Sequence, residues 1–197
     1  MVTKYYSLSY PQSGATWLRY IARNLLNINK PYNEIDKDDA IYTKTHSLPM
    51  GGYNTYDKNK HLILVIKDFK ECIPAHISTT QPTQKSIIEY VHPLQKFYEW
   101  QKPKKIIYYQ DLILNTKETI YDFANFLSID NSITSSFCNN LDYHKAYSRK
   151  QHVRACLSQD NLCYYQQKFQ LNIKQWNTII KCVIPSHLLT YLEPFLE

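Results

Sequence analysis

The feature that most constrains the fold is a Ser-Gly turn, Tyr10–Trp17, between a strand pattern at Lys4–Ser9 and a helix pattern at Thr16–Ile28. The first N–H groups of a helix have no intrahelical partner, and the helix dipole adds a partial positive charge beside them. A strand that turns straight into a helix can therefore cradle an anion. Only 3 of the 197 residues are glycine, and Gly14 lies in this turn, where the backbone needs a positive φ or a close approach to a ligand. The other interpretation is an ordinary turn with a hydroxyl cap, and the octapeptide alone favours neither.

Strand patterns alternate with helix patterns along the chain. Leu62–Ile66 is an unbroken apolar run, which is typical of a strand buried on both faces of a parallel sheet. Such alternation predicts a three-layer α/β fold with a central parallel sheet flanked by helices. Ligands of these folds bind beyond the carboxyl ends of the strands, where the motifs of this chain fall. The predicted strands are Lys4–Ser9, Ala40–Thr45, Leu62–Ile66 and Lys105–Tyr109.

The helix patterns carry apolar stripes at helical spacing. Pro93 is expected to break or kink the helix predicted at Ser86–Trp100. Asn115 is the expected N-cap of the next helix. Beyond Asp130 the pattern is largely helical to the C-terminus, with breaks near Tyr143–Ser148 and at Pro185. The predicted buried faces are Trp17, Ile21, Leu25 and Ile28 in the first helix, and Ile120, Phe123, Ala124 and Leu127 in the helix after Asn115.

Length and composition indicate one packed domain over residues 1–197, with a motif-bearing core at 4–130 and a helical part at 131–197. A hydrophobic content of 44% and an aromatic content of 14% do not fit a disordered chain. The net charge of +6 is dispersed, so it is compatible with a phosphate-bearing ligand and equally with a solvated surface.

The five cysteines form no Cys-x-x-Cys pair, and no His/Cys cluster has metal-ligand spacing. We therefore expect reduced, mostly buried thiols, no metal site and a cytoplasmic location. The longest aliphatic run, Leu62–Ile66, is too short to span a bilayer, and no apolar signal segment precedes the first strand.

Two further strand ends carry charged or titratable side chains. Lys44 and His46 are two residues apart at the end of the second strand, so their side chains are expected to point to the same face. Histidine is well suited to accept a proton near neutral pH, although a histidine at a strand end is more often a surface residue. The run Leu62–Ile66 is followed by the charged residues Lys67 and Asp68. These charges either belong to a functional site or simply mark the point where the strand meets solvent.

Four segments, taken in order, resemble the sulfotransferases that use 3′-phosphoadenosine 5′-phosphosulfate (PAPS). The family's Tyr-Pro-Lys/Arg-Ser-Gly-x-Thr-Trp loop is matched by Tyr10–Trp17, and its Lys-Thr-His segment by Lys44–His46. Its Arg-Asp-Pro strand end is approximated by Lys67–Phe69. Its Tyr-Tyr-Glu-Asp-Leu and Phe-Leu-Gly segments look like Tyr108–Leu112 and Phe126–Ser128.

This resemblance implies a P-loop NTPase-like sulfotransferase fold and transfer of a sulfuryl group from PAPS to a hydroxyl or amine of a small-molecule or glycan acceptor. His46 would remove the acceptor proton, and Lys44 would stabilise charge on the transferred group. Trp17 would pack against the adenine, or it is a core residue of the helix stripe. Asp111 and Tyr108 would hold the strand-to-helix corner. The implied cofactor-binding residues are Gln12, Ser13, Gly14, Ala15 and Thr16 at the 5′ end, Trp17 at the adenine, and Lys67, Arg149 and Lys150 at the 3′-phosphate.

The chain also departs from the family pattern. Gln12 stands where the family has a cation, and Lys67 replaces an arginine, which removes the bidentate fork. Ala75 stands where the family commonly has a phosphate-binding serine, with His76 and Ser78 as candidate replacements, and the late Arg-Lys-Gly segment lacks its glycine. These departures leave open a weakened or inactive relative that binds an adenosine phosphate or a partner without chemistry.

Two other classes are disfavoured. A P-loop kinase needs a Gly-Lys-Ser/Thr ending that the turn at Tyr10–Trp17 lacks. Nucleic-acid binding has only the mild positive charge in its favour, so no nucleic-acid partner is expected. The oligomeric state and the acceptor are not indicated by any pattern in the sequence.

Overall fold

A computed structural model describes residues 3–28, 41–45, 60–77 and 84–153 of the chain. In this part of the protein, β1 (Lys4–Ser9), β2 (Tyr42–Thr45), β3 (Lys60–Ile66) and β4 (Lys104–Tyr108) form one sheet. The strands pair in the order β2-β1-β3-β4, and every pair is parallel. The predicted α/β class with a central parallel sheet is confirmed, and the strand boundaries differ from the predicted ones by two residues or fewer.

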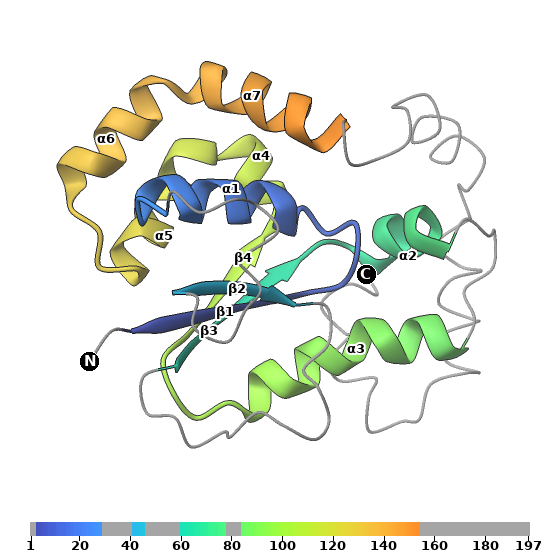
Figure 1. The fold of residues 1–197 in the computed structure, drawn as a ribbon. Coiled ribbons are helices and arrows are strands. Elements are labelled where there is room, and N and C mark those ends of the chain that lie inside the picture. The colour runs from blue at the N-terminus through green and yellow to red at the C-terminus, as the bar shows by residue number, and fades with distance from the viewer. Residues whose placement is uncertain (1–2, 29–40, 46–59, 78–83, 154–197) are drawn as a thin grey trace.

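The described helices cover both faces of this sheet. Figure 1 shows α1 and α5 on one face and α3 on the other. The helix bounds are α1 Ala15–Leu25, α2 Phe69–Ile77, α3 Gln84–Glu99, α4 Tyr109–Leu114, α5 Thr116–Phe126, α6 Asn131–Asn139 and α7 Leu141–Val153. None of them has the length and apolar character needed to cross a membrane.

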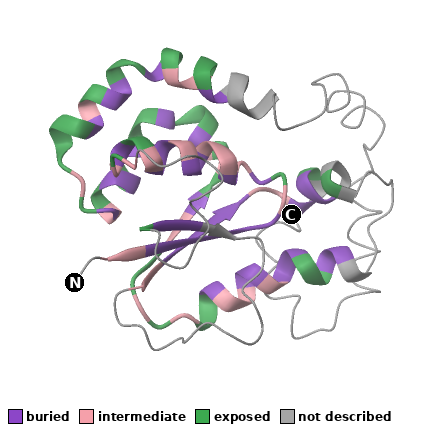
Figure 2. Cartoon of the chain, in the orientation of Figure 1, coloured by how far each residue is buried: buried purple, intermediate pink, exposed green. Residues whose placement is uncertain are grey.

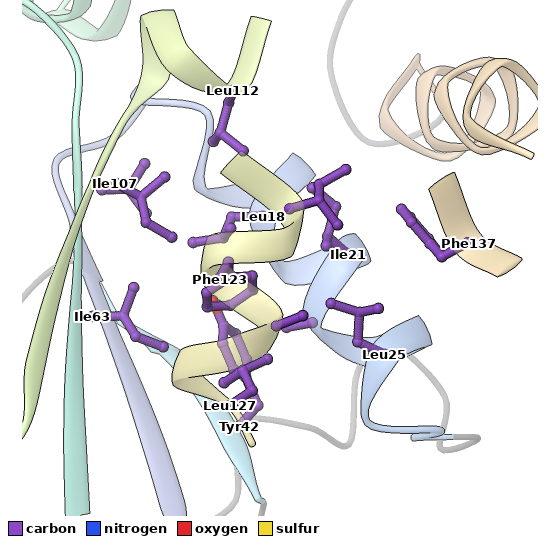
Figure 3. Packing of buried hydrophobic residues seen from close by; sticks show 14 of the residues in the cluster. Leu18, Ile21, Leu25, Tyr42, Ile63, Ile107, Leu112, Phe123, Leu127 and Phe137 are labelled. Atoms are coloured by element: carbon purple, nitrogen blue, oxygen red, sulfur yellow. The ribbon is translucent and has the colours of Figure 1, made fainter. Parts of the chain in front are cut away.

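Side-chain alternation along the strands divides the core into two clusters. Leu62 and Leu64 of β3 face α2 and α3, whereas Ile63 of the same strand faces α1 and α5. The strand is therefore buried on both faces, as its unbroken apolar run predicts. Figure 2 shows this burial along the strands, and Figure 3 shows Ile63, Leu18 and Phe123 gathered between the sheet and helices α1 and α5.

The helix α3 passes through Pro93 without interruption, so a break at this residue is wrong, whereas the alternative expectation of a kink stays a prediction. A proline inside a helix costs about 3 kcal/mol, because it removes a hydrogen bond and crowds the preceding turn. Burial of each large apolar side chain contributes about 1.5–3 kcal/mol, which offsets that cost when several are buried on both sides of the proline. The buried residues of this face are Ile87, Tyr90, Val91, Leu94 and Phe97.

The predicted break near Tyr143–Ser148 is also wrong, because α7 runs unbroken from Leu141 to Val153. The chain turns at Asn140 instead, between α6 and α7. His144, in the first turn of α7, stacks on Phe137 of α6 with ring centroids 4.0 Å apart, so this unbroken helix begins packed against its neighbour. The predicted break at Pro185 lies outside the described residues, and so does the part of the single predicted domain beyond residue 153.

Other local predictions can also be compared with the structure. Helix α5 follows Asn115 as expected, but the Asn115 side chain makes no capping hydrogen bond. The buried face predicted for α5 is confirmed, since Ile120 and Phe123 are fully buried. Cys72 and Cys138 are buried and form no disulfide, and burial raises the pKa of both thiols. The other three cysteines lie outside the described residues.

Candidate functional site

The chain leaves the two central strands toward opposite faces of the sheet. Strands β1 and β3 are paired neighbours, with Ser9 opposite Val65 near their carboxyl ends. Helix α1, which follows β1, packs in the cluster that contains Ile63, whereas α2, which follows β3, packs in the cluster that contains Leu64. This is a topological switch point, the position at which open parallel α/β sheets bind ligands. The switch point places the turn after β1 beside the end of β3.

The turn after β1 has a backbone shape that sequence alone only partly anticipates. Gly14 has a φ of 84°, as expected for the glycine of this turn, and Gln12 has a φ of 65° although it carries a side chain. Ser13 is buried, and its hydroxyl donates a hydrogen bond of 2.6 Å to the Tyr10 carbonyl. The Ser13 hydroxyl therefore stabilises the turn itself, and the side chain of Gln12 is left exposed at its tip.

The amino terminus of α1 keeps its positive partial charge. Gly14 is the N-cap residue, no side chain makes a capping hydrogen bond, and the first turn holds no acidic residue. The N–H groups of Trp17 and Leu18 both donate to the Gly14 carbonyl, at 3.0 and 3.3 Å, so the helical hydrogen bonds begin there. The preceding N–H groups, those of Ala15 and Thr16, have no intrahelical acceptor and are available to an anion.

Tyr109 joins this turn to the end of β3. A Cβ atom at Gly14 would overlap the Tyr109 ring, so the glycine is required by the close approach of an aromatic side chain. The ammonium of Lys67 lies 4.7 Å from the centroid of the same ring. The register of the sheet explains why these residues meet. Ile66 of β3 is paired with Tyr108 of β4, and the residues that follow this pair are Lys67 and Tyr109. Three of the four segments that resemble sulfotransferase motifs therefore meet at one ring.

Tyr109 has no role among those predicted from the sequence. Tyr108 is predicted to be a corner residue, and it is indeed the N-cap of α4, with its side chain partly exposed. The position of Tyr109 follows from the pairing of β3 with β4, which places the first residue after β4 beside the first residue after β3. Asp111 lies in the first turn of α4, where its carbonyl accepts a hydrogen bond of 2.9 Å from the Asn115 N–H.

Lys67 is not an open cation in this structure. Its ammonium pairs with the Glu71 carboxylate at 3.1 Å, and its side chain is only 12% exposed. The Lys67 carbonyl also accepts a hydrogen bond of 2.7 Å from the hydroxyl of Tyr90 in α3. The residue is thus held through both its backbone and its side chain, and its predicted contact with a 3′-phosphate stays a prediction.

Trp17 is a packed residue of α1. Its ring stacks on Tyr20 with centroids 5.5 Å apart and an interplanar angle of 13°, and it lies against the core cluster on this face of the sheet. The Tyr20 hydroxyl shares a hydrogen bond of 2.9 Å with Nδ1 of His144 in α7. This packing supports the core interpretation of Trp17, and contact with an adenine stays a prediction.

The remaining predicted site residues are only partly described. Lys44 lies in β2, paired in register with Ser7 of β1, so its backbone is one strand away from the turn. His46 lies outside the described residues. Arg149 and Lys150 belong to the last turns of α7, whose carboxyl end lies on the same side of the molecule as the amino end of α1 in Figure 1.

The position of the family's phosphate-binding serine and its two candidate replacements are also only partly described. Ala75 lies within α2, and Ser78 lies outside the described residues. The His76 ring is exposed and meets the Tyr10 ring edge-on, with centroids 5.4 Å apart, so this imidazole lies at the beginning of the turn. Of the two candidate replacements, His76 is the one that the structure describes, and its ring lies beside the turn.

Within the part of the chain that the structure describes, no group of three or more His, Cys, Asp or Glu side chains is arranged to hold a metal ion. Comparison with known proteins adds no assignment: no protein-family model matches the chain, and no curated protein matches it.

Proposed function

We propose that this chain is a PAPS-dependent sulfotransferase with a P-loop NTPase-like sulfotransferase fold, acting on a hydroxyl or amine of a small-molecule or glycan acceptor. The observation that carries the proposal is the meeting of Gly14, Lys67 and Tyr109. These residues come from separate segments that resemble the family's motifs, and they converge at the switch point of the sheet. The parallel register brings the ends of β1, β3 and β4 together, and three of the four segments that resemble the family's motifs lie at these ends.

The residues of the turn fit the anionic end of such a nucleotide. The N–H groups of Ala15 and Thr16 begin a helix that has no side-chain cap and no acidic residue in its first turn, which suits a phosphate or sulfate group. When bound, PAPS supplies the sulfuryl group that the acceptor takes up. On the protein's side, His46 would accept the acceptor proton, and Lys44 would neutralise negative charge on the transferred oxygens. Catalysis would rest on positioning and on these charges, as in phosphoryl transfer.

The second candidate function is binding of an adenosine phosphate without turnover. It is favoured by Gln12, which leaves the exposed tip of the turn without a cation, and by the pairing of Lys67 with Glu71. Both features lower the positive charge available for transition-state stabilisation, whereas ground-state binding by N–H groups needs less of it.

Two measurements separate these functions. Calorimetric titration with adenosine 3′,5′-bisphosphate tests binding, and incubation with sulfur-labelled PAPS and mixed acceptors tests transfer. We expect both to be positive, and we expect His46→Ala to reduce transfer by about 10²–10⁴-fold while binding persists. His92→Ala, at a partly buried histidine of α3, is the matched control and should keep its activity.

Binding without labelled product from any acceptor would favour the non-catalytic candidate. Absence of binding would contradict both. Transfer by His46→Ala within a few fold of the wild-type rate would remove His46 from the mechanism.

A further inference from the structure

The ammonium of Lys67 already has an anionic partner within the chain. The Glu71 carboxylate lies 3.1 Å from it, and the two side chains differ sharply in exposure, 12% for Lys67 and 54% for Glu71. Lys67 follows β3, whereas Glu71 belongs to the first turn of α2, so this contact joins a strand end to a helix start. Any anion that binds at the end of β3 meets Glu71 as a competitor.

The two partners are not equally free to move. Lys67 is fixed by the Tyr90 hydroxyl at its carbonyl and by the Tyr109 ring beneath its ammonium. Glu71 is more than half exposed, so its carboxylate can turn into water at little cost. Only the Glu71 half of the pair is exposed, so water competes for its carboxylate, whereas the largely buried Lys67 ammonium keeps its need for an anionic partner. An incoming anion would therefore displace Glu71 and leave Lys67 in place.

We propose that Glu71 is a positioning residue that holds the Lys67 ammonium against the Tyr109 ring and competes with the ligand for it. The proposal rests on the proposed function, since it concerns the same anion site. An anion that binds Lys67 must first displace the Glu71 carboxylate, so the chain's own carboxylate lowers the apparent affinity of the site for every anion by the same factor. The exchange remains favourable for a phosphate monoester, whose charge of about −1.5 to −2 at neutral pH exceeds the −1 of the carboxylate.

The test compares anion affinity in Glu71→Gln and in the wild type. We expect Glu71→Gln to bind adenosine 3′,5′-bisphosphate and inorganic pyrophosphate roughly two- to fivefold more tightly in a calorimetric titration, because the competitor is gone. Glu99→Gln is the matched control. Its carboxylate pairs with Lys96 at 2.9 Å near the end of α3, beside the amino end of β4, and its removal changes the net charge equally. This variant should bind both anions as the wild type does.

A double-mutant cycle shows whether the gain acts through the lysine. In a Lys67→Gln background, Glu71→Gln should no longer tighten binding. A gain that persists there would overturn the proposal, because it would reflect net charge alone, and unchanged or weaker binding by Glu71→Gln would overturn it as well. Tighter binding of pyrophosphate by Glu71→Gln, with no binding of the adenosine bisphosphate by either protein, would contradict the proposed function and leave this inference standing. Binding of neither anion by any of the proteins would overturn both.

Discussion

Two strand-to-helix turns lie side by side at the carboxyl edge of the sheet, one after β1 and one after β3. Their backbones begin the following helices in the same way: two successive N–H groups donate to the Gly14 carbonyl in the first turn and to the Asp68 carbonyl in the second. Their charges differ. Helix α1 has no acidic residue in its first turn, whereas α2 has Glu71 there. The first helix start remains available to an external anion, and the second already holds an internal one.

The difference shows how little of an anion site follows from topology alone. A parallel strand followed by a helix gives the dipole and the unpaired N–H groups at both positions. The side chains in the first helical turn of each helix then determine whether an external anion binds there favourably.

The largest effect is expected from adding a methyl group at Gly14. Gly14→Ala places a Cβ into the Tyr109 ring and forces alanine to a φ of 84°. A non-glycine residue in this conformation costs about 1–3 kcal/mol before any clash is counted. We expect the free energy of unfolding, measured by urea denaturation, to fall by about 2–4 kcal/mol.

A second variant isolates the contribution of the ring. Tyr109→Ala removes the overlap but not the strained φ, so the double variant should lose less stability than the sum of the two single variants. Additive losses would mean that Gly14 is needed for its backbone conformation only.

The second prediction makes the first turn resemble the second. Thr16→Asp adds an acidic residue at the partly buried second position of α1. It should stabilise the helix by about 0.3–1 kcal/mol through the dipole, and it should weaken adenosine bisphosphate binding about tenfold by occupying the same positive charge. Stability and affinity therefore change in opposite directions. Thr16→Asn is the uncharged control, and wild-type affinity in Thr16→Asp would place the anion elsewhere.

The third prediction strengthens the contrast between the two turns. Gln12→Lys adds a cation at the exposed tip of the first turn. Affinity for the adenosine bisphosphate should rise roughly two- to fivefold, in keeping with a solvent-screened charge, and sulfuryl transfer should become faster. Gln12→Leu, which has similar size and no charge, should bind as the wild type does. A lower rate in Gln12→Lys would contradict the position assigned to this residue.

The smallest effect concerns the packing of α1 against α7, in which His144 of α7 bonds to Tyr20 of α1. Burial lowers the pKa of His144 below its ordinary value of 6.5. As the pH falls below 6.5, the unfolded chain takes up a proton that the folded protein does not yet bind, so stability is complete above this pH and decreases below it. His144→Gln should reduce the loss of stability between neutral and mildly acidic pH, measured by urea midpoints. His61→Gln is the comparison variant, because burial lowers the pKa of His61 as well.

The regular part of the fold could be predicted from periodicity. The strand pattern located β1, which is buried on both faces, and the apolar residues at helical spacing located the buried face of α5. Pro93 and the interior of α7 could not be predicted in this way. Local propensity favours a break at each, whereas both helices run on unbroken and pack against other elements.

Within the candidate site, the position of the turn after β1 could be predicted, but the contacts of its residues could not. The turn after β1 stands out in the sequence because a single glycine follows a strand. The role of Tyr109 depends on the pairing of Ile66 with Tyr108, which is a property of the assembled sheet. The pairing of Lys67 with Glu71 depends on where β3 ends and α2 begins.

The stack of Trp17 on Tyr20 gives the protein a built-in optical reporter. The indole belongs to the first turn of α1 and is in ring contact with a tyrosine that bonds to His144 of α7. With Trp100 and Trp176 replaced by phenylalanine, the emission spectrum would monitor this one corner of the molecule. Quenching or a wavelength shift on adding nucleotide would then reveal occupancy of the turn in solution, without any label.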